Sequence, residues 1–496
     1  MYNVLPAKKY LIILMEVSLK DIYNSPLSSR YASKEMNKIF SEDNKFTLWR
    51  KLWIALAESE KELGLEISDI QINEMKEHLH DINYDDAKKK EQEIRHDVMS
   101  HVYAFGKQCP HAKPIIHLGA TSCFVGDNSD IIMMTQALKL LKQKIVKIIE
   151  LLSDFAIKTK NIPTLAYTHF QAAQPTTVGK RATLWIQDLV MDIESINHLL
   201  DNIQLLGCKG TTGTQASFLS LFNGDDEKVK QLDKKIAQKM GFKKCFDVSG
   251  QTYSRKFDSN VLAVLSAVAQ SAAKFSNDIR LLQHLKEIEE PFENKQIGSS
   301  AMPYKRNPMR CERIAALCRF IITQSLNAPL TASTQWFERT LDDSANRRLC
   351  ISESFLALDG VLNTYINVSG GLVVNEKIIE KHLMDEIQFM ATENILMEAV
   401  KSGGDRQILH EKIREYSMAE SYLIKKEGKE NHLLDKVLAD KDFHLSQKQL
   451  KKIKDPKNYI GRASNQTQEY IDEVVMPLIN KNKSNVNIDE NNLVNI

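Results

Sequence analysis

The sequence lacks an excess of charge of either sign. Its 66 lysines and arginines nearly balance 64 aspartates and glutamates, which leaves a formal net charge of +2. Proteins that bind nucleic acid or anionic membrane surfaces usually carry a strong basic excess, so we expect neither partner. Metal-ligand motifs such as His-Glu-x-x-His are also absent, and His78 and His80 lie in a Glu/Lys-rich segment typical of solvated surface. We therefore expect no metal and no cofactor.

Cysteine is scarce as well. The seven cysteines are an odd number and form no C-x-x-C pair, a pattern that fits reduced thiols in the cytosol rather than a disulfide framework. We expect a cytoplasmic protein in which each cysteine is a small buried hydrophobe. The apolar run Tyr10–Met15 is too short for a secretory signal or a membrane span. We interpret residues 1–20 as an extension, with Met15 as an alternative start.

What the sequence has in abundance is helical periodicity. Apolar residues recur at steps of three and four over Ile131–Phe155, Val178–Leu206 and Phe257–Leu282, which places one apolar stripe along each helix. Alternating apolar runs typical of strands are few. Helices of this length usually pack as a bundle. The pattern predicts an all-α protein with a central long-helix bundle.

Proline and glycine mark the breaks between these helices. The segment from Pro163 to Thr177 is predicted to be a structured loop, and Pro291 is predicted to end the third long helix. Pro308 can occupy the first turn of a further helix over Met309–Leu326. We predict an N-terminal helical domain over residues 1–121, a central bundle domain over residues 122–374 and a C-terminal helical domain over residues 375–496. Within the last of these, residues 480–496 are predicted to be a disordered tail rich in Asn and Lys.

One polar segment stands out, Gly298–Pro308, with the sequence GSSAMPYKRNP. Its small residues suit a mobile lid. Lys305 and Asn307 come just before a predicted helix N-terminus, where free N–H groups favour an anion. Judged by charge alone, an exposed basic turn or a nucleic-acid contact is the preferred interpretation of the segment.

Three other polar segments interrupt the helical pattern. His169 follows Thr168 in a loop rich in glutamine, where a His alone would more often be an ordinary surface residue. Arg95, His96 and Asp97 are consecutive, so they cannot share one helix face. The segment 336–348 carries several arginines, and two of them are nine residues apart, which in one helix would place them on opposite sides. A turn near residues 342–344 would be needed to bring them together, and ion pairs with the acidic neighbours are the alternative for part of the cluster.

The Gly298–Pro308 segment closely resembles the G-S-S-x-M-P-x-K-x-N-P loop of the fumarase/aspartase superfamily. Its Tyr-Lys-Arg form resembles the adenylosuccinate lyase branch, and the resemblance extends from about Ser25 to about Pro477. It implies a three-domain fold whose bundle forms the core of a homotetramer, with active sites that draw on three subunits. It also implies small succinylated purine nucleotides as substrates: fumarate would be eliminated from adenylosuccinate, giving AMP, and from succinylaminoimidazole carboxamide ribotide, giving the carboxamide ribotide, in purine biosynthesis.

The resemblance also implies roles for individual residues. Ser299 would be the catalytic base and His169 the general acid. Lys305 would stabilise the developing charge, and His96 would orient the reacting groups or support charge near them. The substrate-binding residues would be Arg30, Tyr31, Arg95, Asp97, Thr121, Ser122, Thr168, Gln251, Asn307, Arg313, Arg339, Ser344 and Arg348.

Three alternatives remain at this point. Another fumarate-releasing lyase, such as an argininosuccinate lyase, is disfavoured by the phosphate-type arginines and by the form of the loop at Tyr304. A catalytically silent helical scaffold is disfavoured because Ser299, His169 and Lys305 are all present. An RNA-binding helical protein is disfavoured by the near-neutral charge.

Overall fold

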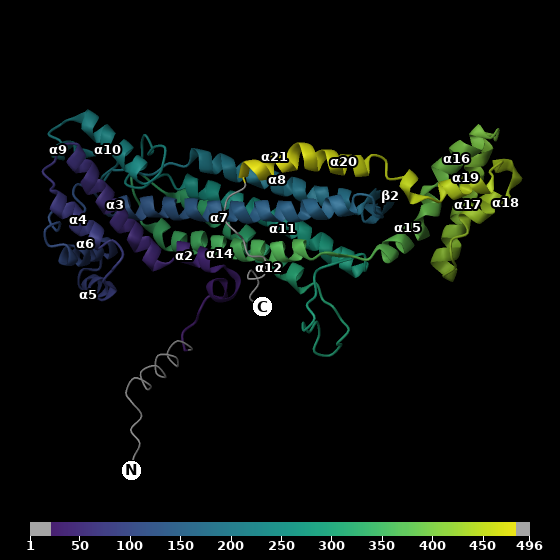
Figure 1. Cartoon of the computed structure of the whole chain (residues 1–496), viewed down its shortest axis with the longest axis horizontal. Helices are drawn as coiled ribbons and strands as arrows, with labels where there is room; N and C mark the ends of the chain where they lie inside the picture. Colours follow the sequence, from purple (N-terminus) through teal and green to yellow (C-terminus); the bar gives the residue numbers. More distant parts are fainter. Residues whose placement is uncertain (1–20, 483–496) are drawn as a thin grey trace, which may run out of the picture.

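The computed structural model describes residues 21–482, apart from the side chain of Leu450. Met15 and the N-terminal extension lie outside the described residues. The molecule is elongated, and its centre is a bundle of long helices that run side by side (Figure 1). The bundle consists of α7 (Ser122–Thr159), α8 (Val178–Asn202), α11 (Lys256–His284), α12 (Met309–Gln324) and α14 (Asp342–Gly370). The predictions of an all-α fold and of a long-helix bundle are confirmed.

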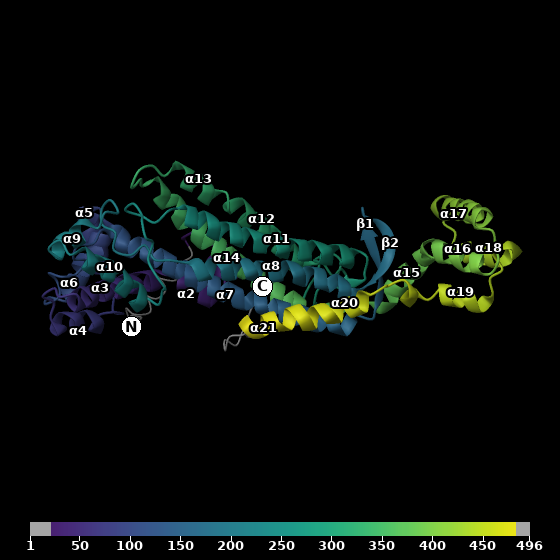
Figure 2. The same ribbon diagram turned by 90° about the horizontal axis from the view of Figure 1, so that it is seen from above.

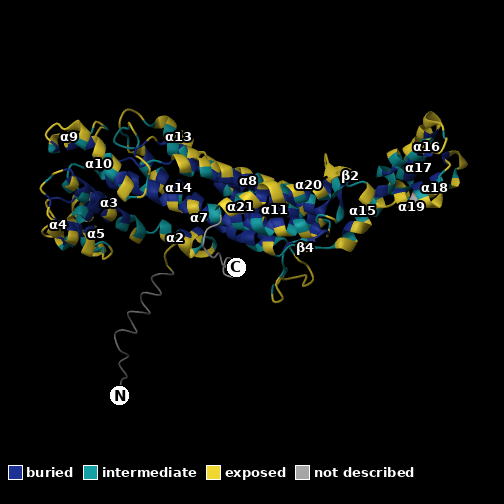
Figure 3. Cartoon of the chain, turned by 45° about the horizontal axis from the view of Figure 1, so that its top comes forward, coloured by how far each residue is buried: buried dark blue, intermediate teal, exposed yellow. Residues whose placement is uncertain are grey.

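Apolar stripes hold the bundle together. Most residues that define the predicted stripes, including Leu138, Trp185 and Val268, are buried in one hydrophobic cluster, and Phe155 and Phe257 are partly buried against it. Figure 3 shows the buried residues along the inside of the bundle and the exposed ones on its outer faces. All seven cysteines are buried and free, which confirms their interpretation as small hydrophobes.

Three predicted helix ends were wrong. The helix α8 ends at Asn202, and Leu205 and Leu206 are buried in an extended segment that meets Cys245 and Phe246. Leu206 is therefore buried as part of a loop, and its match to the apolar spacing of α8 is a coincidence. The helix α11 ends at His284 because the chain turns there into β3 (Ile288–Glu289), which pairs with β4 (Val373–Val374). The helix α12 ends at Gln324, before α13 (Asn327–Thr334), and Pro308 is its N-cap rather than part of its first turn.

The segment predicted as a loop between the first two long helices is a β-hairpin. Strand β1 (Pro163–Thr168) pairs antiparallel with β2 (Gln171–Thr177). His169 and Phe170 have φ of +52° and +59° and form the turn, as a two-residue hairpin turn of this type requires. The outer half of the hairpin is exposed on both faces, so it shows no apolar alternation that the sequence could have revealed.

The N-terminal helices form a second hydrophobic cluster around Trp49 and Trp53. This part of the chain begins with the π-helical turn η1 (Leu27–Tyr31) and α2 (Lys34–Ile39), which pack on the bundle. The other helices here are α3 (Glu42–Glu62), α4 (Asp69–Glu77), α5 (Tyr84–Ile94), α6 (Asp97–Gln108), α9 (Ala216–Leu221) and α10 (Asp226–Lys239).

A third cluster lies at the opposite end of the molecule (Figure 1). The elements in this part of the chain are α15 (Glu376–Met390), α16 (Thr392–Lys401), α17 (Arg406–Glu427), α18 (Leu433–Ala439), η2 (Lys441–Phe443), α19 (Gln447–Ile453) and η3 (Pro456–Asn458). The chain then returns along the bundle through α20 (Ala463–Tyr470), η4 (Ile471–Val475) and α21 (Met476–Asn482), which pack on α7 and α8. The tail predicted from residue 480 therefore begins too early, since α21 includes residues 480–482; the rest of it lies outside the described residues.

Candidate active site

The predicted site residues fall into separate groups. The length of α7 determines the distance between two of these groups. Thr121 is the N-cap of α7 and Ser122 its first residue, whereas the hairpin that carries Thr168 and His169 follows its last residue. A helix of 38 residues spans about 57 Å at about 1.5 Å per residue. Figure 2 shows the hairpin at the end of the bundle remote from the N-terminal helices. One chain therefore does not bring His169 to Thr121.

The first group lies where the N-terminal helices meet the start of α14. Arg95 ends α5 in a left-handed conformation, with φ of +56°. His96 is the N-cap of α6 and accepts a hydrogen bond from the Met99 amide, and Asp97 is the first residue of α6. The three consecutive charged residues thus form a corner between two helices. Asp97 reaches Arg348 of α14, with Oδ2 and Nη2 3.4 Å apart, so the structure brings these two predicted segments together.

His117 belongs to this group, although the sequence did not single it out. The Trp53 indole donates to His117 Nδ1 at 2.9 Å, which leaves the proton of the neutral ring on Nε2. Burial, together with the neighbouring His96, lowers the His117 pKa to about 4. His117 is therefore neutral at pH 7. The one available signal was its position four residues before Thr121.

The arginine segment is bent as predicted, but the bend comes earlier. Phe337 has φ of +53° and α14 begins only at Asp342. Arg339 therefore lies in the turn, whereas Ser344 and Arg348 lie four residues apart on one face of the helix. The alternative of ion pairing holds for part of the cluster, because Arg339 Nη1 contacts the Asp343 carboxylate at 3.0 Å and 3.1 Å.

Gln251 is held beside this turn by close backbone packing. The backbone N–H of Gln251 donates to the Glu338 carbonyl at 3.0 Å. A Cβ at Gly250 would lie 2.4 Å from that same carbonyl oxygen, and a Cβ at Gly213 would lie 1.9 Å from the Ser249 oxygen. The absence of side chains at the two glycines therefore allows three loops to stack, and places Gln251 next to Arg339.

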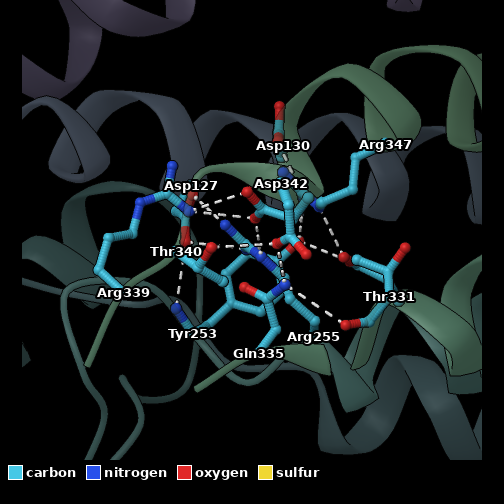
Figure 4. Close-up of polar contacts among 12 residues, drawn as sticks. Asp127, Asp130, Tyr253, Arg255, Thr331, Gln335, Arg339, Thr340, Asp342 and Arg347 are labelled. Carbon is cyan, nitrogen blue, oxygen red and sulfur yellow. Dashed lines mark hydrogen bonds and ion pairs between the residues drawn. The ribbon is translucent and has the colours of Figure 1, made fainter. Parts of the chain in front are cut away.

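Beneath these groups lies a buried network of arginines and aspartates (Figure 4). In one half of it, Arg255 bridges Asp127 and Asp343. In the other half, Arg347 contacts Asp130, Asp258 and the Tyr253 hydroxyl; the Asp130 contact is 3.0 Å and the Tyr253 contact 2.6 Å. The sequence did not identify this network, because its members come from α7, α11, α14 and a loop, and only the packing of the bundle brings them together.

A second group is the loop Gly298–Pro308, which projects from the bundle (Figure 1). Ser299 Oγ accepts hydrogen bonds from the amides of Ala301 and Met302, at 3.3 Å and 3.1 Å. Asn307 closes the loop by donating to the Gly298 carbonyl at 2.6 Å. Lys305 is exposed, and its ammonium makes no hydrogen bond or ion pair within residues 21–482. Two N–H donors are what a negatively charged serine oxygen needs, and Lys305 adds a positive charge to the same loop.

This loop is also distant from the arginine cluster of the same chain. It leaves the C-terminal end of α11, where the Gln283 side chain donates to the Arg306 carbonyl at 3.1 Å. Arg255 precedes the other end of α11. The 29 residues of α11 span about 44 Å at about 1.5 Å per residue, so Ser299 and Gln251 stand near opposite ends of this helix.

Arg30, Tyr31 and Arg313 form a third group on the side of the bundle. The Arg313 guanidinium lies 5.8 Å from the centre of the Tyr31 ring. Tyr31 approaches α14 at Gly360, where an added Cβ would lie 2.8 Å from the Tyr31 Cβ. Burial lowers the Arg313 pKa from its ordinary value. The contact of Tyr31 with Arg313 unites two predicted substrate-binding residues that are far apart in the sequence.

Within the part of the chain that the structure describes, no group of three His, Cys, Asp or Glu residues is arranged to hold a metal ion. Over the same residues, no helix combines the length and the apolar character that a membrane crossing requires.

Solved structures with the same fold confirm the architecture. A 3-carboxy-cis,cis-muconate lactonizing enzyme from Pseudomonas putida superposes with a TM-score of 0.80 over 93% of this chain and 100% of its own, at 20% identity. A fumarate lyase from Mesorhizobium sp. BNC1 superposes with a TM-score of 0.77 over 91% of this chain and 100% of its own, at 18% identity. At these identities the likeness concerns the fold alone.

Sequence comparison defines the family. Residues 28–323 match the lyase family model, and residues 388–470 match the model of the adenylosuccinate lyase C-terminus. The adenylosuccinate lyase of Saccharomyces cerevisiae is 50% identical over 92% of this chain and 95% of its own length. That of Schistosoma mansoni is 46% identical over 95% and 98%, and that of Pyrococcus abyssi is 30% identical over 91% and 97%. With its fold, its family-model matches and these relatives, the chain belongs to the adenylosuccinate lyase family.

Proposed function

We propose that this protein is a carbon–nitrogen lyase that eliminates fumarate from adenylosuccinate, giving AMP, and from succinylaminoimidazole carboxamide ribotide, giving the carboxamide ribotide. The observation that carries the proposal is the 50% identity to the yeast adenylosuccinate lyase over nearly the whole chain. The Gly298–Pro308 loop supports it, because its donors and cation suit the charge that a β-elimination develops.

In the proposed reaction, Ser299 takes a proton from the succinyl Cβ. The electrons of that C–H bond become the new carbon–carbon double bond as the C–N bond breaks. His169 gives its proton to the departing nitrogen. Lys305 and Asn307 stabilise the charge that accumulates on the adjacent carboxylate. His96 orients the reacting groups, and neutral His117 can add a donor at Nε2.

Substrate binding is assigned to the remaining residues. Arg339, Ser344 and Arg348 would hold the phosphate, so that binding energy gained far from the reacting bond positions the substrate. Gln251 is assigned to a substrate carboxylate. The other proposed contacts come from Arg30, Tyr31, Arg95, Asp97, Thr121, Ser122, Thr168 and Arg313.

The protein is proposed to work as a homotetramer with shared sites. Support comes first from two distances along the bundle, one between Thr121 and His169 and one between Gln251 and Ser299, which another copy could bridge. It comes also from apolar side chains left exposed on the long helices and the adjoining turn, which a partner would cover: Leu184, Met191, Leu281, Trp336, Phe337, Leu341 and Leu349. The buried, reduced thiols are consistent with a cytoplasmic location.

The test is a steady-state absorbance assay of the purified full chain with adenylosuccinate, the succinylated ribotide, argininosuccinate and malate. We expect turnover of the two purine substrates only. Turnover of argininosuccinate or malate instead would replace the proposal with another lyase of the superfamily, and no turnover of any of them would indicate a silent scaffold. Ser299→Ala should abolish turnover while the variant still binds adenylosuccinate; near-normal turnover would remove Ser299 as the base.

A further inference from the structure

We infer that Asp343 is a positioning residue that orients Arg339 toward the substrate phosphate and is itself held by a buried Arg255–Asp127 pair. The inference rests on the proposed function, because it assumes that Arg339 contacts a phosphate. It concerns residues that the resemblance to known lyases did not single out.

The way Asp343 contacts Arg339 leaves one edge of the guanidinium available. Both Asp343 oxygens accept from the same nitrogen, Nη1, at 3.0 Å and 3.1 Å. Nε and Nη2 of Arg339 have no hydrogen-bond partner among residues 21–482, and the side chain is 24% exposed. The Nε–Nη2 edge presents two parallel N–H groups, which is the geometry that binds a phosphate through two hydrogen bonds. Asp343 thus holds the arginine by one nitrogen and leaves this edge free.

Asp343 is rigidly held in its turn. It is fully buried in the first turn of α14, and Arg255 Nε donates to its Oδ2 at 2.7 Å. The other two nitrogens of Arg255 contact Asp127 of α7, Nη1 to Oδ2 at 3.0 Å and Nη2 to Oδ1 at 3.1 Å. This fork-to-fork pairing fixes the plane of the Arg255 guanidinium. The Arg339 orientation is therefore determined from α7 and α14 through an unbroken chain of charge-assisted bonds.

The same chain links the segments that would bind one nucleotide. Asp127 lies in the second turn of α7, which begins with Thr121 and Ser122. Arg255 follows Gln251 by four residues. A buried ion pair is weak evidence for a gain in stability, because desolvation offsets the attraction. A network whose carboxylates are all paired instead fixes relative geometry, which is what a binding site made of several loops needs.

The decisive variant is Asp343→Asn, which preserves size and removes the charge. We expect the KM for adenylosuccinate to rise about tenfold or more, as the loss of one charge-assisted contact implies, with kcat within about threefold of wild type. The inhibition constant for AMP should rise in parallel. The matched control is Asp130→Asn in the other half of the network, since Asp130 contacts Arg347 and not Arg339 or Arg255; it should lower thermal stability without raising KM.

A double-mutant cycle separates positioning from structure. If Asp343 acts through Arg339, then Asp343→Asn should add little to the KM already raised by Arg339→Gln. Fully additive effects, or an unchanged KM in a folded Asp343→Asn variant, would overturn the inference. If Asp343→Asn fails to fold, Arg255→Lys is the second variant. We expect it to raise the KM for adenylosuccinate, because a lysine cannot bridge the carboxylates of Asp127 and Asp343. An unchanged KM in Arg255→Lys would overturn the inference equally. If the wild-type protein itself shows no turnover of adenylosuccinate, that result would instead refute the proposed function.

Discussion

Mixing two inactive variants, Ser299→Ala and His169→Gln, is expected to restore activity. Within one chain, the hairpin that carries His169 and the α7 start at Thr121 are about 57 Å apart along the 38-residue helix. The proposed site includes both segments, so it would have to combine segments from different copies. If a site takes Ser299 from one subunit and His169 from another, each segment is intact with probability one half in an equal mixture. About one quarter of the sites should then be functional in a randomly mixed closed oligomer.

The measurement is turnover of adenylosuccinate after the two variants are co-expressed with different affinity tags and purified through both. Recovery near one quarter of the wild-type rate is expected. The matched control is a mixture of Ser299→Ala with Lys305→Met, because both residues lie on one loop and no subunit of the mixture would supply an intact loop. Doubly tagged oligomers without recovered activity would refute the reasoning, and so would a control that recovers as much as the test mixture.

Three further predictions follow from single residues. Glu60 is fully buried, neither of its oxygens has a hydrogen-bond partner among the described residues, and burial raises its pKa to about 8. Because this folded-state pKa lies above the unfolded value of about 4.3, the free energy of unfolding falls as pH rises from about 4.3 to about 8, by as much as about 5 kcal/mol. The stability advantage of Glu60→Gln over wild type in urea should therefore be several kcal/mol larger at pH 8 than at pH 5, and an equal difference at the two pH values would contradict this. Arg339→Glu should raise the KM for adenylosuccinate about 100-fold, since a repulsion replaces a charge-assisted contact, and an unchanged KM would reject its phosphate role. Gly298→Ala should lower kcat about tenfold without changing Tm, because the new Cβ would lie 2.0 Å from the Lys305 carbonyl oxygen in a loop outside the core; unchanged kcat would show that the loop conformation is not required.

The sequence predicted the bundle because its signal is local. A helix buries one face every three to four residues, so the stripes that contain Leu138, Trp185 and Val268 were visible without knowledge of their partners. The hairpin at His169 was missed for the converse reason. Its outer residues are exposed on both faces, so no alternation marked the strands, and the two positive φ values of its turn have no signature in His169 and Phe170.

The residues proposed for the candidate site were also named from the sequence, through the Gly298–Pro308 string and the polar segments at His96, His169 and Arg339, and their roles stay predictions. Their arrangement was not. Helix lengths, not motifs, decide that Thr121 and His169 of one chain stand at opposite ends of the bundle. The proposal of shared sites gains its physical basis from that distance.

What the sequence by itself determined is the set of local structures and the chemical groups on offer: long amphipathic helices, a glycine-initiated loop with a serine and a lysine, and clustered arginines. Only the tertiary structure decided which of these groups meet. The pairing of Asp97 with Arg348, the burial of Asp343 between two arginines and the contact of Tyr31 with Arg313 all join residues from separate helices or loops. Contacts of this kind depend on how the helices pack against one another, and polar contacts between separate elements, unlike an apolar stripe, leave no periodic pattern in the sequence.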